Sequence, residues 1–365
     1  MASEAVQIQA GERSVRVSSP DRVIFEATDF SPAVTKAMVA QYYADVEDGI
    51  MRALRNRPVT LERWPKGVRP GMELSTRQDS RGADAFYQKR MMRGAPDFVE
   101  SATVTFPSGR RAEELCITEI ASVVWAAHMG AVTFHPWATR RDDNDRPDEL
   151  RIDLDPHGAT TFADAVRVAG TARELLDDLG VRGFAKTSGN RGVHVYVRIE
   201  RRWTITDVRH AAMAFGRELE RRTDGVTTAW WKEERGDNIF VDFNQNARDR
   251  TIASAYSIRP KPGAPVSMPL TWDELAALDD PRQFTVHSVP ALLAERGDAM
   301  EQIDDVAHSL EPFLALWEAD VERGLGEMPY PPDYPKMPGE PPRVQPSKKV
   351  AEHWDEAGNR RPDRA

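Results

Sequence analysis

RIDLDPHGATTFADAVRVAGTARELLDDLGVRGFAKTSGNRGVHVYV, residues 151–197, is the stretch of sequence that decides the fold. It has the pattern of a short apolar strand at 150–154, a helix at 162–179, and two short strands at 184–187 and 193–199 around a glycine turn. Strands and helices that alternate at these lengths predict an α+β fold, close to α/β, with central mixed sheets flanked by helices.

The same alternation continues on both sides of this stretch. Downstream, the pattern predicts a helix at 207–221 and a strand at 239–243. Upstream, Ser31 as N-cap and Pro32 at the first helical position predict a long helix, because apolar residues then recur every four positions up to Leu54. Further strands are predicted at 58–64, 85–91, 103–106 and 131–135, and a further helix at 119–128.

The C-terminal part of the chain differs from the rest. We expect residues 1–309 to form the main folded body, with one module at about 17–140 and a second, which contains the motif RIDLDP, at about 148–305. A helix is predicted at 310–323, and eight prolines lie between Pro329 and Pro346. Such a segment cannot fold alone, so residues 310–365 are interpreted as a helix and a flexible tail, either a linker or a docking strap.

The composition of the 365-residue chain, 40% hydrophobic and 29% charged, is that of a soluble globular protein. The N-terminus has no cationic start before an apolar run, and no stretch approaches the roughly 18 apolar residues of a membrane helix. We therefore expect a cytoplasmic protein. The single cysteine, Cys116, excludes an internal disulfide framework and a CxxC metal site.

The charge is unevenly distributed along the chain. The formal net charge is −9, which by itself argues against nucleic-acid binding. Residues 52–93, however, hold eleven Lys or Arg against four Asp or Glu, a local charge of +7 (11 − 4), with Trp64, Phe86 and Tyr87 among them. Basic side chains neutralise phosphates and aromatic faces stack on bases, so this segment suits a nucleic-acid strand or strand end. The alternative is a solvated basic face with aromatic residues in the core.

Two acidic residues of the motif RIDLDP, Asp153 and Asp155, are candidate metal ligands. Residues two apart on a strand point to the same face, roughly 6.6 Å apart. Two carboxylates at that distance repel by about 2.5 kcal/mol at an effective dielectric constant near 20, which favours a cation or a proton between them. Oxygen ligands suit Mg²⁺ or Mn²⁺. A lone pair of this kind also occurs at solvent-facing strand ends.

The turn SGNRG with the following histidine is a candidate phosphate-binding element. Glycines at 189 and 192 would let backbone N–H groups approach an anion, and Ser188, Arg191 and His194 add side-chain donors. An ordinary glycine hairpin with a packed histidine is the alternative.

A third candidate position is Asp242 in NIFVDFNQN, where Val241 and Phe243 alternate with the acid in the pattern of a strand. An isolated aspartate here would usually be a strand-end or capping residue. A third carboxylate beside a pair, together with a phosphate-binding turn, is nevertheless the set that two-metal phosphoryl transfer needs.

These motifs resemble those of a known superfamily, the archaeo-eukaryotic primases. More specifically, RIDLDP, TSGNRGVHVY, IFVDFNQN, SAYSIRP and RWPKGV are similar to the polymerase domain of the bacterial ligase of non-homologous end joining and its stand-alone relatives. The resemblance covers residues 17–305 and leaves the Pro-rich tail outside. It implies the primase-polymerase fold and a nucleotidyl transferase that extends a primer 3′-OH on a template.

The resemblance also implies roles for individual residues. Asp153, Asp155 and Asp242 match the catalytic metal ligands, and Arg22 and Lys36 match positions that bind a 5′-phosphate across a gap or break. The implied nucleotide contacts are Ser188, Gly189, Arg191, His194, His135, Gln245 and Arg259. The implied further DNA contacts are Arg63, Trp64, Phe86 and Tyr87, of which Phe86 and Tyr87 match an aromatic pair that stacks on the template.

Two positions depart from the family pattern. Arg191 stands where the turn usually carries lysine, which keeps the charge but changes its shape. Glu62 stands where relatives can carry a lysine, so a nucleotide contact from that position is not expected.

The implied cofactors are two divalent ions, Mn²⁺ or Mg²⁺, and the implied substrates are nucleoside triphosphates, with a preference for ribonucleotides, and gapped or broken DNA with a 5′-phosphate. Ku and a separate DNA ligase are implied as partners, in a bacterial, nucleoid-associated setting. The pathway stays open between end joining and gap filling in excision repair, with gap filling favoured. Two other functions are weighed: a non-catalytic module that bridges DNA ends, and a metal-dependent phosphatase or nuclease.

Overall fold

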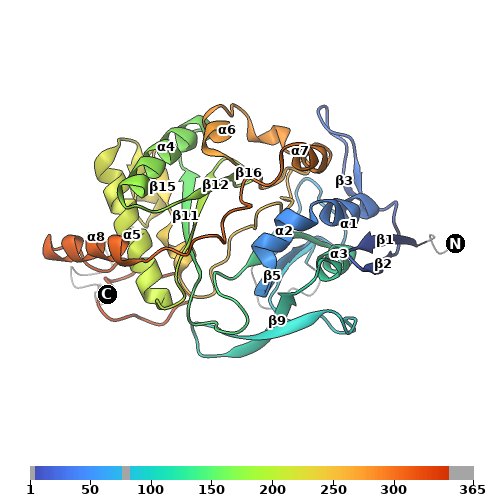
Figure 1. The fold of residues 1–365 in the computed structure, drawn as a ribbon, viewed down its shortest axis with the longest axis horizontal. Coiled ribbons are helices and arrows are strands. Elements are labelled where there is room, and N and C mark those ends of the chain that lie inside the picture. The colour runs from blue at the N-terminus through green and yellow to red at the C-terminus, as the bar shows by residue number, and fades with distance from the viewer. Residues whose placement is uncertain (1–4, 76–82, 345–365) are drawn as a thin grey trace, which may run out of the picture.

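The structure, a computed structural model, describes residues 5–75 and 83–344 (Figure 1). Part of the basic segment predicted to bind nucleic acid, including Arg77 and Arg81, lies outside these residues. The described chain is built on two mixed sheets, and the predicted α+β fold is confirmed. No helix of the described residues has both the length and the apolar character needed to cross a membrane.

The N-terminal sheet has the strand order β6-β7-β5-β9-β8, with β10 also paired to β5. Its pairs are antiparallel except for β6 with β7. The helices α1 and α3 pack against each other and against the hairpin β1–β2 at one end of the molecule (Figure 1). The elements of this half are β1 (Val6–Ala10), β2 (Arg13–Val17), β3 (Val23–Phe25), β4 (Val34–Thr35), α1 (Lys36–Asp45), α2 (Glu47–Leu54), β5 (Arg57–Arg63), β6 (Leu74–Ser75), β7 (Ala85–Gln88), β8 (Glu100–Thr105), β9 (Arg111–Ile117), α3 (Ile120–His128) and β10 (Ala131–Pro136).

The second sheet has the strand order β14-β15-β11-β13-β12-β16, and β14 with β15 is its parallel pair. The long helices α4 and α5 cover this sheet, and α8 packs on α5 (Figure 1). The elements are β11 (Glu149–Pro156), α4 (Phe162–Asp178), β12 (Phe184–Thr187), β13 (Val193–Arg198), α5 (Ile205–Arg222), β14 (Val226–Thr227), η1 (Lys232–Glu234), β15 (Ile239–Val241), η2 (Phe243–Asn246), β16 (Pro269–Leu270), α6 (Trp272–Ala276), η3 (Pro281–Gln283), α7 (Val289–Arg296) and α8 (Glu311–Glu322).

The first helix begins later than the sequence predicts. Residues 34 and 35 are extended, because Thr35 pairs with Val23 and Val34 pairs with Phe25. Thr35, and not Ser31, is the N-cap: its side chain accepts a hydrogen bond from the backbone N–H of Met38. The predicted single helix is also interrupted at Val46 and continues as α2. The prediction of one helix capped by Ser31 is therefore wrong.

The strand predicted at 239–243 ends at Val241, because Asp242 caps a short 3₁₀ turn, η2. The carboxylate of Asp242 accepts a hydrogen bond from the backbone N–H of Asn244. Asp242 is therefore both a strand-end residue and a capping residue, and the alternation of Val241 and Phe243 around it is not that of a continuing strand.

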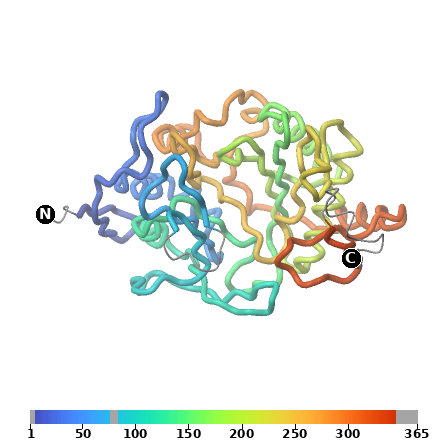
Figure 2. Tube along the Cα trace, turned by 180° about the vertical axis from the view of Figure 1, so that it is seen from behind, coloured from blue at the N-terminus to red at the C-terminus, as the bar shows by residue number. Residues whose placement is uncertain are grey.

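The Pro-rich segment is a docking strap where the structure describes it. Residues 326–344, called the strap below, run back over the second half of the molecule (Figure 2, red). Tyr330 and Tyr334 are buried, and with Met337 they pack against Ala247. Up to Val344 the segment packs on the body through these tyrosines and through backbone carbonyls that accept hydrogen bonds from Arg209.

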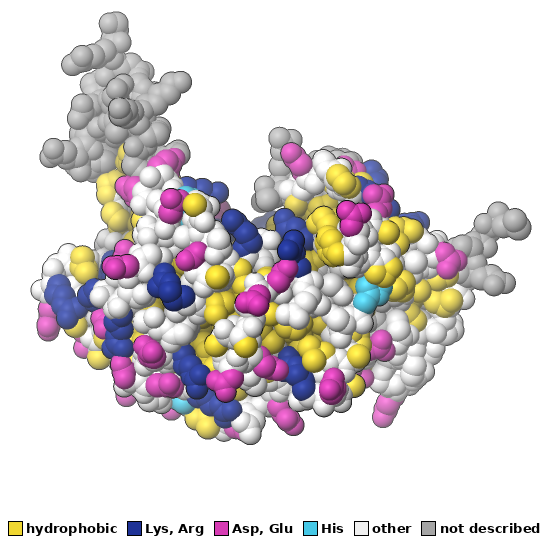
Figure 3. Space-filling model, turned by 90° about the horizontal axis from the view of Figure 1, so that it is seen from above, with side chains coloured by type: hydrophobic (Ala, Val, Ile, Leu, Met, Phe, Trp, Pro, Cys, Tyr) yellow, Lys and Arg dark blue, Asp and Glu magenta, His cyan; other side chains and the backbone are white. Residues whose placement is uncertain are grey.

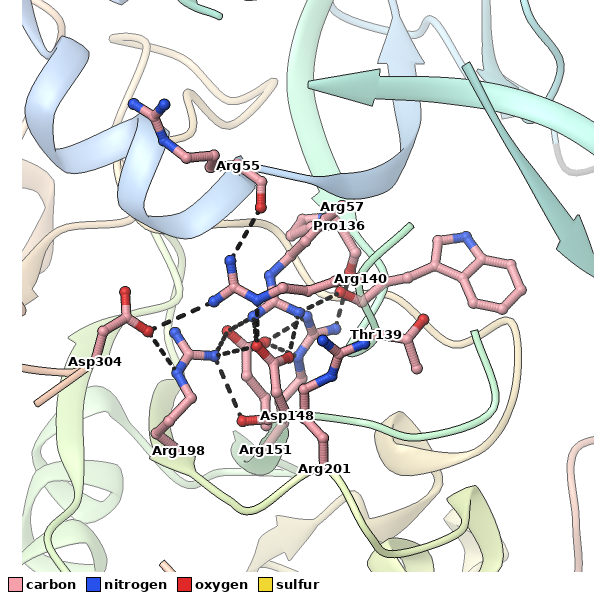
Figure 4. A network of polar contacts seen from close by, with 12 residues as sticks. Arg55, Arg57, Pro136, Thr139, Arg140, Asp148, Arg151, Arg198, Arg201 and Asp304 are labelled. Carbon is pink, nitrogen blue, oxygen red and sulfur yellow. Dashed lines mark hydrogen bonds and ion pairs between the residues drawn. The ribbon is translucent and has the colours of Figure 1, made fainter. Parts of the chain in front are cut away.

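A buried ionic network joins the two sheets (Figure 4). Arg57 of β5 donates to both carboxylate oxygens of Asp148, at 2.6 and 2.9 Å, and to Glu149 of β11 at 2.9 Å. Arg198 of β13 donates to the same two carboxylates, at 3.2 and 3.0 Å, and Arg151 donates to Glu149 at 2.7 Å. Burial opposes ionisation of Asp148, but Arg57, Arg198 and Arg140 hold its pKa well below the ordinary value. The network fixes how the two sheets meet.

Candidate active site

Strand β11 carries Asp153 and Asp155, and the segments beside it carry His194 and Asp242. Asp153 is paired across the sheet with His194 of β13, and Asp155 with Phe240 of β15. The backbone N–H of Asp242, directly after β15, donates to the carbonyl oxygen of Asp153 at 3.0 Å. The sheet therefore brings the three acidic residues together from segments far apart in the sequence.

The electrostatics of these carboxylates suit a cation. Asp153 is 4% exposed, and its Oδ1 atom has no hydrogen-bond partner, although Nε2 of His194 lies 3.3 Å away. Burial, together with Asp155 and Asp242, raises the pKa of Asp153 well above its ordinary value. Burial and Asp155 raise the pKa of Asp242 to about 6. A divalent ion would remove this repulsion and supply the missing partner.

The side chains are not arranged as a ready-made metal centre. Among residues 5–75 and 83–344, no three His, Cys, Asp or Glu side chains are grouped so that they could hold an ion. Both oxygens of Asp242 are occupied, since Oδ1 accepts from the N–H of Asn244 at 3.1 Å and Oδ2 from Nε2 of Gln245 at 3.0 Å. The residue types fit a divalent ion, and coordination by all three needs their side chains to turn.

Lys186 is a buried neighbour of this site that the sequence analysis does not single out. Its Nζ atom lies 2.8 Å from Nδ1 of His194 and donates to the carbonyl of Ala253 at 2.9 Å and to Oγ of Ser267 at 2.5 Å. Burial lowers the pKa of both Lys186 and His194 well below their ordinary values. A lysine in the apolar strand β12 could have pointed to this residue in the sequence, because a buried ammonium group needs dedicated hydrogen-bond acceptors.

The glycine turn between β12 and β13 lies against β11. A Cβ atom on Gly192 would meet the carbonyl oxygen of Leu154 at 2.8 Å and Oδ1 of Asp155 at 3.0 Å, so only glycine allows this approach. Within the turn, the N–H of Gly192 donates to Oγ of Ser188 at 3.0 Å, as does the N–H of Asn190 at 3.2 Å. The hydroxyl proton of Ser188 and the exposed guanidinium of Arg191 remain as donors.

Arg259 and His135 extend the polar surface beside the turn. Gly189 adopts a φ of +71°, and a Cβ atom there would lie 2.5 Å from Cγ of Arg259, which places this arginine against the turn. The Nε atom of Arg259 is buried and has no hydrogen-bond partner. Nε2 of His135 lies 3.2 Å from Oε2 of Glu62. Burial opposes ionisation of Glu62, but the hydrogen bond from His135 leads the effects that lower its pKa, so Glu62 is a charged acceptor that orients His135.

The four DNA contacts expected from the basic, aromatic segment differ in accessibility: Tyr87 is exposed, Arg63 and Phe86 are half-buried, and Trp64 is buried. Tyr87 is exposed and its ring meets that of His135 edge to face at 5.6 Å, and the guanidinium of Arg63 stacks over Phe86 at 5.2 Å. Trp64 is 5% exposed, and its indole N–H donates to Glu62 at 3.1 Å. The indole ring lies in the hydrophobic core and its N–H is bonded to Glu62, so Trp64 is a core residue and not a DNA contact.

Arg22 and Lys36 lie beside each other at the N-terminal end of the molecule. Nη1 of Arg22 donates to the carbonyl of Pro65 at 3.1 Å, and Nζ of Lys36 to that of Ser18 at 2.9 Å. Burial, and then the charge of Arg22, lower the pKa of Lys36 to about 8. Neither cation is paired with an acid in these bonds, which leaves them suited to an external anion. More widely, Lys and Arg side chains gather where the surface dips between two raised parts of the molecule (Figure 3).

Comparison with solved structures gives the class of protein. The polymerase domain of Mycobacterium tuberculosis ligase D, solved in complex with DNA, is similar to this chain with a TM-score of 0.70 and 28% sequence identity. The similarity covers 81% of this chain and 100% of that domain. The fold and the acidic strands are thus those of a nucleotidyl transferase of the primase-polymerase class.

The sequence gives the family. Residues 35–300 match the family described as LigD, primase-polymerase domain, and the chain belongs to this family. It is 32% identical to the multifunctional non-homologous end joining protein LigD of Pseudomonas aeruginosa, over 87% of this chain and 36% of that protein. It is 29% identical to the bifunctional LigD of Bacillus subtilis, over 78% of this chain and 43% of that protein. The chain therefore spans less than half the length of these relatives.

Proposed function

We propose that this protein extends a primer 3′-OH on a DNA template, adding nucleotides at short gaps or breaks during DNA repair, with ribonucleotides preferred. The observation that carries the proposal is the set of Asp153 and Asp155 on β11 and Asp242 directly after β15, beside a turn that presents Ser188 and Arg191. Among the described residues, one buried oxygen of Asp153 lacks a hydrogen-bond partner. This set suits in-line attack of the 3′-oxygen on the α-phosphorus, with pyrophosphate leaving.

The three aspartates would hold two divalent ions, Mn²⁺ or Mg²⁺, which when bound lower the pKa of the 3′-hydroxyl and neutralise charge on the leaving oxygens. Gln245 and the N–H of Asn244 orient the Asp242 carboxylate. Burial raises the pKa of Asp153, so this carboxylate is poorly stabilised as an anion until a cation is present.

The remaining site residues bind and orient the substrates. Arg191, Arg259 and the Ser188 hydroxyl would contact the triphosphate, and His194 would donate a hydrogen bond to it. His135, whose Nε2–H is held by Glu62, would contact the nucleotide as an acceptor through Nδ1. The exposed Tyr87 and the neighbouring Phe86 would stack on the template with Arg63 beside them. Arg22 and Lys36 would bind the 5′-phosphate on the far side of the gap.

The family supports a role in end joining. Within DNA repair, we propose that the protein fills short gaps, that a separate ligase seals the product, and that Ku is an end-binding partner. A module that only bridges DNA ends would keep the basic surfaces without turnover. The same carboxylates with water as nucleophile would give a phosphatase or nuclease. The turn with Ser188 and Arg191 beside them suits a triphosphate better than the substrate of such an enzyme.

Primer extension on gapped DNA tests the proposal. The wild-type protein should add nucleotides in Mn²⁺ or Mg²⁺, faster from ribonucleotides than from deoxyribonucleotides. The Asp153→Ala, Asp155→Ala variant should lose addition and keep its affinity for DNA, since these residues act on the metal and not on the DNA backbone. If the wild type binds DNA but adds no nucleotides, the alternative function of bridging DNA ends is favoured. If the variant keeps more than a few per cent of the addition, other residues hold the metal.

A further inference from the structure

The position of the Asp242 carboxylate depends on the short turn that follows it. Asp242 caps η2, and its side chain accepts hydrogen bonds from the backbone N–H of Asn244 and from the Gln245 side chain. Whatever holds this turn therefore also determines where the carboxylate lies relative to Asp153 and Asp155.

The Asn244 side chain connects the turn to the strap. Asn244 is 3% exposed; its Nδ2 donates to the carbonyl of Pro329 at 3.0 Å, and its Oδ1 accepts from Nε of Arg209 at 2.7 Å. Arg209, on α5, is itself fully buried. Its Nη2 donates to the carbonyls of Met328 and Pro329, at 2.9 and 3.2 Å, and its Nη1 pairs with Glu327. Arg209 therefore binds the turn and the strap at once.

Aromatic contacts reinforce the same connection. The Arg209 guanidinium lies 3.7 Å from the centre of the Tyr330 ring and 5.2 Å from that of Phe243, the first residue of η2. Beyond the turn, Ala247 packs against Tyr330 and Tyr334. The hydroxyl of Tyr334 donates to the carbonyl of Arg248. The strap thus contacts the segment that leads away from Asp242 at Asn244, Ala247 and Arg248.

The strap is internally ordered and can act as a brace. Glu340 is 7% exposed and accepts hydrogen bonds from the backbone N–H of Tyr330 at 2.8 Å and of Met337 at 3.0 Å. Arg343 donates to the carbonyls of Pro331 and Tyr334, at 3.1 and 2.8 Å. These bonds close the strap into a loop with a fixed shape. The family match ends at residue 300, so the strap lies outside the part of the chain that the family describes.

We propose that the strap is a positioning element for the active site: through Arg209 and Asn244 it holds the η2 turn, and with it the Asp242 backbone from which the carboxylate turns to bind metal. The proposal rests on the proposed function for the role of Asp242. It predicts that the strap affects metal binding and turnover without contacting either substrate.

The test compares three full-length variants. Arg209→Met removes the guanidinium that bonds to both turn and strap, and Asn244→Ala removes the turn side chain that bonds to Arg209 and to the Pro329 carbonyl. Lys336→Ala is the control, because this exposed strap residue bonds to Pro341 within the strap and faces no part of the turn. Mn²⁺ affinity is measured by electron paramagnetic resonance, nucleotide addition by single-turnover primer extension, DNA affinity by anisotropy, and folding by thermal melting.

Arg209→Met and Asn244→Ala should each weaken Mn²⁺ binding and slow addition by about tenfold or more, the range seen when groups that orient metal ligands are removed. Their DNA affinity should stay within about twofold of the wild type. In the double variant, the loss of Mn²⁺ affinity and of addition rate should be smaller than the product of the two single losses, because both changes break the same connection. Lys336→Ala should match the wild type.

Two outcomes would overturn the proposal. In the first, the variants melt at lower temperature but bind Mn²⁺ as the wild type does, which would make the strap a purely stabilising element. In the second, the losses of Mn²⁺ affinity from the two changes multiply in the double variant, as they would at independent sites. If the wild type itself fails to add nucleotides, the proposed function fails, while the Mn²⁺ measurements still decide whether the strap positions Asp242. If Arg209→Met does not fold, Asn244→Ala alone carries the comparison.

Discussion

The Nζ atom of Lys186 lies 2.8 Å from Nδ1 of His194, inside the protein and away from solvent. Ser267 gives its own proton to the carbonyl of Thr187 at 2.7 Å, so its oxygen, like the carbonyl of Ala253, accepts from Lys186. The third proton of the ammonium group then goes to Nδ1 of His194. With Lys186 charged, the proton of the neutral imidazole lies on Nε2, which faces Asp153 and the proposed triphosphate site.

Replacement of Lys186 by methionine should release His194 from this tautomer. We expect the ¹⁵N spectrum of labelled histidine to change from the Nε2–H form to a mixture, and the KM for nucleotide to rise by about tenfold while DNA affinity holds. Lys261→Met, at an exposed lysine, is the matched control. An unchanged His194 tautomer in Lys186→Met would mean that the lysine does not set the proton position.

Arg191 should act on the incoming nucleotide. Its guanidinium is exposed and donates a long hydrogen bond, 3.4 Å, to the carbonyl of Pro156, which leaves most of its N–H groups facing solvent and able to bind an anion. Arg191→Ala should raise the KM for nucleotide by about tenfold with a smaller effect on DNA binding. Arg191→Lys should recover most of the loss, since it keeps the charge. A fall in DNA affinity instead would place the turn against the duplex.

Arg22 and Lys36 should give the protein a preference for a 5′-phosphate at the gap. Gapped DNA with a 5′-phosphate is expected to bind more tightly than the same DNA with a 5′-hydroxyl, by about 1–3 kcal/mol for charged hydrogen bonds. The Arg22→Ala, Lys36→Ala variant should bind both DNAs equally. Competition anisotropy measures the difference, and its persistence in the double variant would locate the pocket elsewhere.

The same preference should depend on pH. Burial and Arg22 lower the pKa of Lys36 to about 8, so in the free protein its positive charge is present below that pH and is lost as the pH rises through it. The preference for the 5′-phosphate should therefore weaken between pH 7 and 9, a range in which the phosphate itself keeps its charge. Lys36→Arg should flatten this dependence, because arginine stays protonated. An equal decline in the arginine variant would point to another titrating group.

Local patterns predicted much of the second sheet. The strand at 184–187 has the predicted bounds, and the helix predicted at 310–323 extends from Glu311 to Glu322, because apolar spacing determined both. The acidic strand, the turn and Asp242 were likewise visible as motifs. The start of α1 was not, because pairing of Thr35 with Val23 overrides the local capping signal at Ser31.

Contacts between distant segments explain the other differences. Trp64 was grouped with surface aromatics because sequence does not show that Glu62 bonds its indole. The strap was visible only as proline content, whereas its order comes from Arg209, Glu340 and two buried tyrosines. Lys186 could have been noticed as a charge in an apolar strand, but its acceptors lie about 70 to 80 residues downstream, at Ala253 and Ser267.

The arginine network between the sheets also bears on how the protein unfolds. Arg57 comes from one sheet and Arg198 from the other, and both neutralise Asp148 and Glu149. Separating the halves would leave these buried carboxylates short of counter-charge, and loss of one partner of a buried ion pair costs about 3–5 kcal/mol. Neither half can then melt ahead of the other, and the chain should show a single cooperative transition in calorimetry despite having two sheets.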